Sequence, residues 1–156
     1  MTASIIRPYG VRWMNKTDLP AVLRIERASE TEDVWTSNDF VRHLGKRTLG
    51  AVVAVDDAGD VLGYLAFHVQ AKVTKIANVT VAKDHRRKGV GSTLVLRLAH
   101  VKGRRSRPRL TATVRESNLG AQLFFRALSF RCDGIVPNAY DSPKEPGYLF
   151  IWETTK

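Results

Sequence analysis

The stretch HRRKGVGSTLVLRLA, residues 85–99, places four basic residues and two glycines in seven positions and then becomes apolar. The first turn of a helix offers backbone N–H groups without intrahelical partners and about half a positive charge. Glycine, which has no side chain, lets that backbone approach an anion closely. Phosphate groups bind readily at such a helix N-terminus. The stretch therefore predicts a helix over residues 89–102 whose first turn holds a phosphate.

Two common phosphate-binding loops do not match this stretch. A Walker loop requires Gly-x-x-x-x-Gly-Lys-Ser/Thr, but Lys88 precedes its glycine and Asp84 stands where the first glycine belongs. A Rossmann fingerprint requires a third glycine at the place of Leu94. The pattern that remains is Arg-x-x-Gly-x-Gly, formed by Arg86, Gly89 and Gly91.

The segments on both sides of this loop alternate between strand and helix patterns. Strands are predicted at residues 11–14, 51–55, 61–69, 72–81, 109–114, 130–136 and 148–154. Helices are predicted at residues 17–30, 37–47, 89–102 and 118–128, with Thr17 as the expected cap of the first. The order predicts an α+β fold, in which about four helices flank a mixed, mostly antiparallel sheet of about seven strands. We expect one domain over residues 1–156, because no linker divides the chain.

Composition limits the classes of protein that this chain can belong to. The sequence has 156 residues, is 44% hydrophobic and contains a single cysteine, Cys132, which we expect in the core. One cysteine cannot form an intramolecular disulfide, and no apolar run approaches the ~20 residues of a membrane span. We therefore expect a cytoplasmic protein without a membrane segment. His43 and His100 fall on separate expected helices without metal-site spacing and are predicted to lie on the surface.

The chain carries a net charge of +10, from 25 Lys and Arg against 15 Asp and Glu. Such a balance attracts polyanions without specificity, including RNA, ribosomes and phosphorylated cofactors. The densest run, KGRRSRPR at residues 102–109, is interpreted as a solvated loop or as a patch that faces RNA.

The Arg-x-x-Gly-x-Gly loop, placed between a strand and a helix, resembles the acyl-CoA site of GCN5-related N-acetyltransferases (GNAT). Residues 11–29 are similar to the opening strand and helix of that family, and residues 115–130 to its asparagine-helix motif. Within the superfamily the chain is most similar to RimI-like enzymes, which acetylate the N-terminal alanine of a ribosomal protein. The resemblance covers residues 11–153 and implies the GNAT fold, acetyl-CoA as co-substrate and a protein or peptide N-terminus as acceptor.

The resemblance also implies which residues bind acetyl-CoA. Backbone groups of the strand would contact the acetyl group and pantetheine arm, and the loop would surround the pyrophosphate. The strand residues are Val79, Thr80 and Val81, and the loop residues are Arg86, Arg87, Lys88, Gly89, Val90, Gly91 and Ser92. Asn118 would contact the CoA arm while capping its own helix, and Phe125 would also lie along the cofactor.

Catalytic groups are harder to assign, because the chain departs from the family pattern. RimI-like enzymes use a Glu base and a Tyr acid, and those positions are Thr113 and Phe125 here. Neither side chain transfers protons near neutral pH. We nominate Glu116, acting through a water, and Tyr140, as a phenol near the thiolate, as replacements. Trp35 and Thr113 are expected to contact the acceptor.

The missing base bears on the choice of acceptor. Freeing the lone pair at pH 7 costs about 1 kcal/mol for an α-amine but about 4.6 kcal/mol for a lysine. The sequence therefore predicts transfer to an N-terminal α-amine by direct attack in a ternary complex. Three alternatives stay open: a degenerate acyl-CoA-binding module without catalysis, an acetyltransferase of small amines, and a ribosome- or RNA-associated protein.

Overall fold

The computed structural model describes residues 9–29, 31–103 and 109–153. Within these residues one seven-stranded sheet, in the order β1-β2-β3-β4-β5-β7-β6, carries four α-helices, which confirms the predicted α+β fold. The elements are β1 (Gly10–Trp13), α1 (Leu19–Ala28), α2 (Ser37–Leu44), β2 (Leu49–Val55), β3 (Val61–Val69), β4 (Thr74–Val81), α3 (Val90–Gly103), β5 (Arg109–Arg115), α4 (Leu119–Ala127), β6 (Arg131–Asp141) and β7 (Lys144–Glu153), with short 3-10 turns η1 (Lys16–Asp18) and η2 (Lys83–His85).

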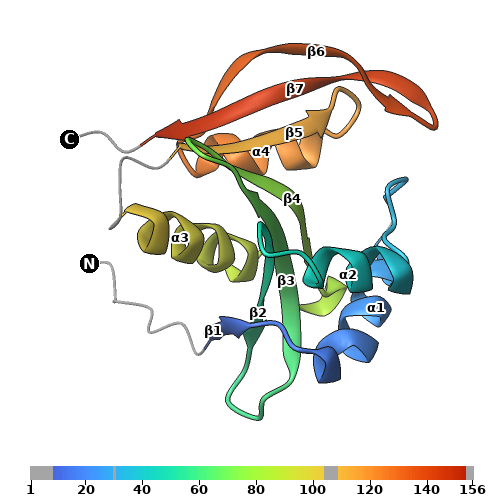
Figure 1. Ribbon diagram of the computed structural model, residues 1–156, viewed down its shortest axis with the longest axis vertical. Coiled ribbons are helices and arrows are strands. Elements are labelled where there is room, and N and C mark those ends of the chain that lie inside the picture. The colour runs from blue at the N-terminus through green and yellow to red at the C-terminus, as the bar shows by residue number, and fades with distance from the viewer. Residues whose placement is uncertain (1–8, 30, 104–108, 154–156) are drawn as a thin grey trace.

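Both faces of the sheet are covered, so the protein has two hydrophobic cores. Figure 1 shows α3 on one side of strands β2–β4 and the pair α1 and α2 on the other. Side chains of β3 alternate between them: Leu65 and Phe67 join the α3 core, and Tyr64 and Ala66 join the α1–α2 core. A strand buried on both faces is apolar at successive positions rather than at every second one.

The first helix begins differently from the prediction. Thr17 is not its cap, because η1 precedes α1 and the Asn15 side chain accepts the Thr17 N–H at 3.0 Å. Asp18 closes this turn by accepting the Asn15 N–H and a bidentate pair of hydrogen bonds from Arg12. The turn thereby fixes where α1 leaves the edge strand β1.

Strands β4 and β5 are neighbours for only part of their length. Among the described residues, their parallel ladder joins Thr74–Ile76 to Leu110–Ala112. The pairing of β4 with β3 shifts register just beyond, at Ala77, and such bulges bend and twist a strand. Figure 1 shows β4 and β5 diverging from this point. The opening between them is the central feature of the fold, because α3 begins where β4 ends.

Two further expectations about single residues are wrong. His43 is buried rather than on the surface, and its Nε2–H donates a 2.8 Å hydrogen bond to the Gly50 carbonyl. Cys132 is exposed rather than in the core, because β6 is an edge strand. Of the basic run at 102–109, residues 104–108 lie outside the described residues. No helix in the described part of the chain is long and apolar enough to cross a membrane.

The buried His43 predicts a pH dependence of stability. Burial lowers the pKa of its imidazole, so the folded protein resists a proton that the unfolded chain accepts below about pH 6.5. The free energy of unfolding should be level above pH 6.5 and fall below it, by at most about 1.4 kcal/mol per pH unit from this group. Urea unfolding of wild type and His43→Gln at pH 7.5 and 5.5 measures the difference. His43→Gln should lose part of the decline, whereas His100→Gln, at an exposed position, should keep it. Identical pH profiles for His43→Gln and wild type would contradict this account.

Candidate active site

The loop before α3 has the backbone shape of an anion site. Arg87 and Gly89 have positive φ angles of 60° and 84°, so the chain reverses sharply before the helix. The Gly89 carbonyl accepts hydrogen bonds from the Thr93 backbone N–H at 3.0 Å and its Oγ1 at 2.7 Å. The side chains of residues 86–88 are exposed. Three exposed cations beside a helix N-terminus fit a polyanion such as a pyrophosphate.

The same loop is fixed to its neighbours on both sides. Arg86 donates from Nε to the Val81 carbonyl at 3.1 Å, which ties the loop to the end of β4. A side chain at Gly91 would place its Cβ only 3.1 Å from the Phe124 ring of α4. Asn118 caps α4 by accepting the Ala121 N–H at 3.1 Å, which confirms its capping role. Its contact with a cofactor stays a prediction.

The strand residues assigned to acetyl-CoA border the opening between β4 and β5. Val79 and Val81 are half-buried and pack on the α3 core, whereas Thr80 faces the α1–α2 side. Alternating side chains leave the strand edge free of steric cover, so the backbone of this segment faces the opening. The arrangement suits a linear arm that runs beside β4.

Thr113 and Phe125 lie on opposite faces of β5. Ala112 and Val114 point into the α3 core, so Thr113, between them, points to the α1–α2 face. Phe125 is 4% exposed in the α3 core, with Phe130 packed edge-on against its ring. Thr113 and Phe125, which the sequence resemblance aligns with the Glu and Tyr of RimI-like enzymes, are therefore separated by the strand itself.

The two nominated catalytic groups differ in where they lie. The Tyr140 hydroxyl donates to the Thr113 carbonyl at 2.9 Å, and burial raises the pKa of its phenol. The Glu116 side chain is exposed, and within the described residues no hydrogen bond joins its carboxylate to Thr113 or Tyr140. The structure thus brings Tyr140, but not Glu116, into contact with Thr113.

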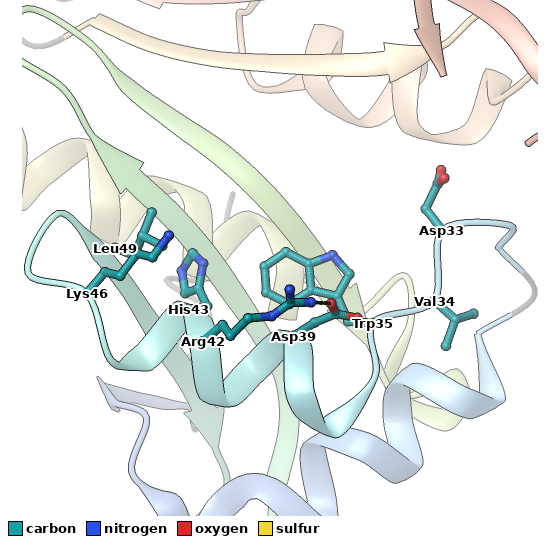
Figure 2. A pocket seen from close by; sticks show the side chains of 8 residues that line it. All are labelled: Asp33, Val34, Trp35, Asp39, Arg42, His43, Lys46 and Leu49. Carbon is teal, nitrogen blue, oxygen red and sulfur yellow. Dashed lines mark hydrogen bonds and ion pairs between the residues drawn. The ribbon is translucent and has the colours of Figure 1, made fainter. Parts of the chain in front are cut away.

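Trp35 borders an open hollow of about 500 Å³ on the α1–α2 face. Side chains from residues 33–35, from α2 and from Leu49 line it, and its volume is in the range of ligand sites. Figure 2 shows the Trp35 indole lying beside α2, while Asp33 points away from that helix. The indole packs on Phe40 and His43, with ring centroids 5.1 and 5.2 Å away.

A buried polar cluster, which the sequence did not predict, lies between this hollow and β4. Glu26, 1% exposed, accepts hydrogen bonds from the Trp35 N–H at 2.8 Å, Asn78 Nδ2 at 2.9 Å and Thr80 Oγ1 at 3.0 Å. Asn78 also donates to the Tyr64 hydroxyl at 2.6 Å. Burial, followed by the nearby Glu26 charge, raises the pKa of that tyrosine. The cluster joins α1, the α1–α2 loop and β4.

One signal in the sequence pointed to Glu26. It lies on the same helical stripe as Val22 and Ile25, and both of these side chains are buried. A carboxyl group on an apolar stripe must find hydrogen-bond partners inside the protein. Its partners, however, are 9, 52 and 54 residues away in the chain.

Comparison with known proteins agrees with this geometry. The sequence profile of the acetyltransferase (GNAT) family matches residues 13–130. The chain belongs to the GNAT family. It is 28% identical over 127 residues to the [ribosomal protein bS18]-alanine N-acetyltransferase of Salmonella typhimurium. The aligned region covers 81% of this chain and 84% of that protein.

Solved GNAT structures share the fold. The ribosomal-protein-S18-alanine N-acetyltransferase of Escherichia coli superposes with a TM-score of 0.80 at 21% identity, over 95% of each chain. Arabidopsis thaliana NAA60 in complex with acetyl-CoA gives a TM-score of 0.78 at 17% identity, over 93% of this chain and 98% of that one. Membership of the acetyltransferase (GNAT) family supports N-acetyltransferase activity with an acyl-CoA co-substrate, and the solved structures show the shared fold.

Charge reversal in the loop should weaken acetyl-CoA binding. At about a hundred times its Kd, a ligand of the native state stabilises the fold by about 2.7 kcal/mol. Lys88→Glu places a negative charge where the pyrophosphate is expected, so the acetyl-CoA-dependent rise in melting temperature should fall by more than half. Thermal unfolding with and without acetyl-CoA measures it.

Arg97→Glu is the matched control, because it makes the same charge change at an exposed position two turns farther along α3. It should retain the wild-type shift. Equal shifts in Lys88→Glu and Arg97→Glu would mean that the pyrophosphate does not bind at this loop.

Proposed function

We propose that this protein transfers the acetyl group of acetyl-CoA directly to the α-amine of a protein N-terminus, in a ternary complex. The observation that carries the proposal is the opening between β4 and β5. A cationic helix N-terminus lies at its α3 end, and the Trp35 hollow lies on its α1–α2 face. The relatives from Salmonella typhimurium and Escherichia coli are named for alanine acetylation of a small-subunit ribosomal protein. A ribosomal protein is therefore the acceptor we propose, within a single domain over residues 1–156.

The reaction assigns separate tasks to the two sides of the opening. The amine lone pair attacks the thioester carbonyl carbon, the C–N bond forms, and the C–S bond breaks with its electrons on sulfur. The thiolate then takes a proton and the new amide nitrogen loses one. Residues 86–92 would hold the pyrophosphate and the backbone of residues 79–81 the arm, with Asn118 beside it. Tyr140 would protonate the thiolate, because a phenol carries its proton at neutral pH and this hydroxyl lies against β5 at Thr113.

The group that would remove the amine proton is less well placed than the proposed acid, Tyr140. Thr113 has no proton-accepting group, so Glu116 would act through a water from its exposed position. An α-amine needs little help, because its pKa lies near 8 rather than the 10.4 of lysine. Sites for small molecules usually enclose most of the ligand surface. The hollow beside Trp35 is open, so it suits the end of a polypeptide better than a small amine.

A second candidate is an acyl-CoA-binding module that transfers slowly or not at all. Phe125, deep in the α3 core, favours it, because an acidic hydroxyl is lacking where the resembled enzymes have one. The net charge of +10 would allow either form to associate with RNA or ribosomes without sequence specificity.

The choice of amine gives one test. A panel of peptides with free N-termini and internal lysines should be acetylated at the α-amine, as mass spectrometry of the products can determine. The rate should rise about tenfold per pH unit up to pH near 8 and then level, because the neutral amine is the nucleophile. Dominant labelling of lysine side chains would contradict the proposed acceptor and would require a strong base.

Restoring the absent proton-transfer groups gives a second test. Thr113 is half-buried on the face that carries the hollow, so a carboxylate in Thr113→Glu can reach water. We expect this variant to raise kcat/KM about tenfold or more. Phe125→Tyr adds a hydroxyl to a packed core and costs about 1–3 kcal/mol if the group finds no partner. Phe130→Tyr adds the same hydroxyl to the same core at a position with no proposed catalytic role, so it measures the stability cost alone. If neither Thr113→Glu nor Phe125→Tyr gains activity while acetyl-CoA still binds, the binding-module candidate takes precedence.

A further inference from the structure

Arg115, the last residue of β5, is the most heavily bonded side chain in the described structure. Its side chain is only 7% exposed, and all five of its N–H donors have acceptors. Nε and Nη2 donate to the two Asp33 oxygens at 2.7 and 2.8 Å, and Nη1 donates to Glu145 Oε1 at 2.8 Å. The remaining N–H groups donate to the carbonyls of Ser142 at 3.2 Å and Pro143 at 3.0 Å. We call these five residues the Arg115 cluster.

The Arg115 cluster joins two segments that come from opposite sides of the opening. Asp33 belongs to the α1–α2 loop (described here over residues 31–36), and Ser142, Pro143 and Glu145 belong to the β6–β7 hairpin. Figure 1 shows that loop rising from the two helices toward the tip of the hairpin. Residues 33 and 115 are 82 positions apart in the chain, so only the folded sheet brings them together. The guanidinium is thus a crosslink between the two segments.

Arg115 and its carboxylate partners keep one another charged despite the burial of the guanidinium. The hydrogen bonds that Arg115 donates to Asp33, and the one it donates to Glu145, raise its pKa against the opposing effect of burial. The Arg115 hydrogen bond, with further bonds from Ser117, lowers the pKa of Glu145. A guanidinium buried without such partners would be strongly destabilising, and here every donor of Arg115 has one.

The cluster lies next to the position at which transfer is proposed. Arg115 and Thr113 are two residues apart on the same face of β5, which corresponds to about 7 Å along the strand. The guanidinium carbon lies 4.2 Å from the centroid of the Tyr140 ring, whose hydroxyl donates to the Thr113 carbonyl. Arg115 therefore holds the proposed acid against β5 with its face while it binds the two carboxylates with its edge.

The α1–α2 loop is held at a second point, Trp35, two residues along the chain from Asp33. The Trp35 N–H donates to the buried Glu26, and its indole borders the hollow that Asp33 also lines. In Figure 2 the Asp33 carboxylate points away from α2, toward the side of the hollow where β5 lies. Asp33 is the residue that the hollow and the Arg115 cluster share. The position of this wall of the hollow is therefore set through Asp33 by Arg115.

We propose that Arg115 is a positioning residue for the acceptor. It fixes the α1–α2 loop against the β6–β7 hairpin, so that the hollow receives an extended polypeptide N-terminus whose amine lies level with Thr113. This inference rests on the proposed function. An extended chain advances about 3.3 Å per residue, so the second and third acceptor residues would pass the Arg115 cluster. The acceptor class is an unfolded N-terminal segment rather than a small amine.

Asp33→Asn tests this role, because it keeps the shape of the side chain but loses the charged bidentate acceptor. The KM for an acceptor peptide should rise about tenfold, since misplacement of a substrate wall by a fraction of an ångström weakens productive binding. The value of kcat should change less than about twofold, and the Kd for acetyl-CoA should not change. Glu32→Gln is the matched control: the adjacent loop residue makes the same charge change, but its carboxylate lies 3.6 Å from Arg115 without a hydrogen bond.

Arg115→Lys separates positioning from direct contact of Asp33 with the acceptor. It retains the positive charge but not the planar fork, so it should raise the peptide KM as Asp33→Asn does. The double variant should be no worse than the worse single variant, because both changes break the same link. A normal KM in Arg115→Lys, or additive effects in the double variant, would overturn the positioning role. If Arg115→Lys does not fold, the comparison of Asp33→Asn with Glu32→Gln still decides.

Hydrogen exchange provides a readout that needs no acceptor. Amides of residues 31–36 should exchange faster in Asp33→Asn than in wild type, while those in α3 should be unchanged. A raised KM without faster exchange would mean that Asp33 touches the acceptor itself, and equal KM effects in Asp33→Asn and Glu32→Gln would mean simple charge attraction. Either result overturns the proposal. If the wild-type protein acetylates no peptide N-terminus, the proposed function is overturned, and with it the acceptor role of Arg115. If the amides of residues 31–36 exchange equally fast in Asp33→Asn and wild type, the crosslink itself is overturned, whatever the activity.

Discussion

The parting of β4 and β5 is the constraint on which the rest of the structure depends. Parallel neighbours in a sheet normally satisfy each other's backbone groups along their whole length. Here the ladder between them ends at Ile76 and Ala112 in the described chain. The bulge at Ala77 turns β4 away, while β5 continues its antiparallel pairing with β7 as far as Arg115. A sheet divided in this way needs other contacts to hold its two halves at a fixed separation.

Those contacts differ on the two faces of the sheet. On the α3 face the contacts are apolar, and a Cβ added at Gly91 of α3 would lie 3.1 Å from the Phe124 ring of α4. On the α1–α2 face it is bridged by polar groups, with Glu26 bound to β4 and Arg115 joining the loop to the hairpin. Apolar packing tolerates small shifts, whereas a bidentate ion pair has one preferred geometry. The polar face is therefore the better suited to hold a reacting amine in place.

The charges are also divided between the ends of the opening. The exposed cations of residues 86–88 lie at the α3 loop, while Asp33 and Glu145 converge on the far end around a single guanidinium. A net charge of +10 describes the chain but not this distribution. A polyanionic co-substrate would be attracted to the cationic end, whereas the carboxylates at the other end are already bound by the guanidinium. The first end would act through charge, and the second through a fixed geometry.

The amino-acid sequence by itself determined the elements, their order and the glycine-containing turn before α3, because these depend on neighbours within a few residues. The apolar stripe of Leu94 and Leu98, the glycines of the loop and the Asn118 cap all act over at most one helical turn. The tertiary structure alone decided that His43 is buried, that Cys132 is exposed, and that Glu26 and Arg115 are crosslinks. The partners of Glu26 on β4 and of Arg115 in the α1–α2 loop lie 52 to 82 residues away, and no local pattern encodes a distance between strands. A buried charged side chain is stable only with hydrogen-bonding partners, and the tertiary structure decides which residues those partners are.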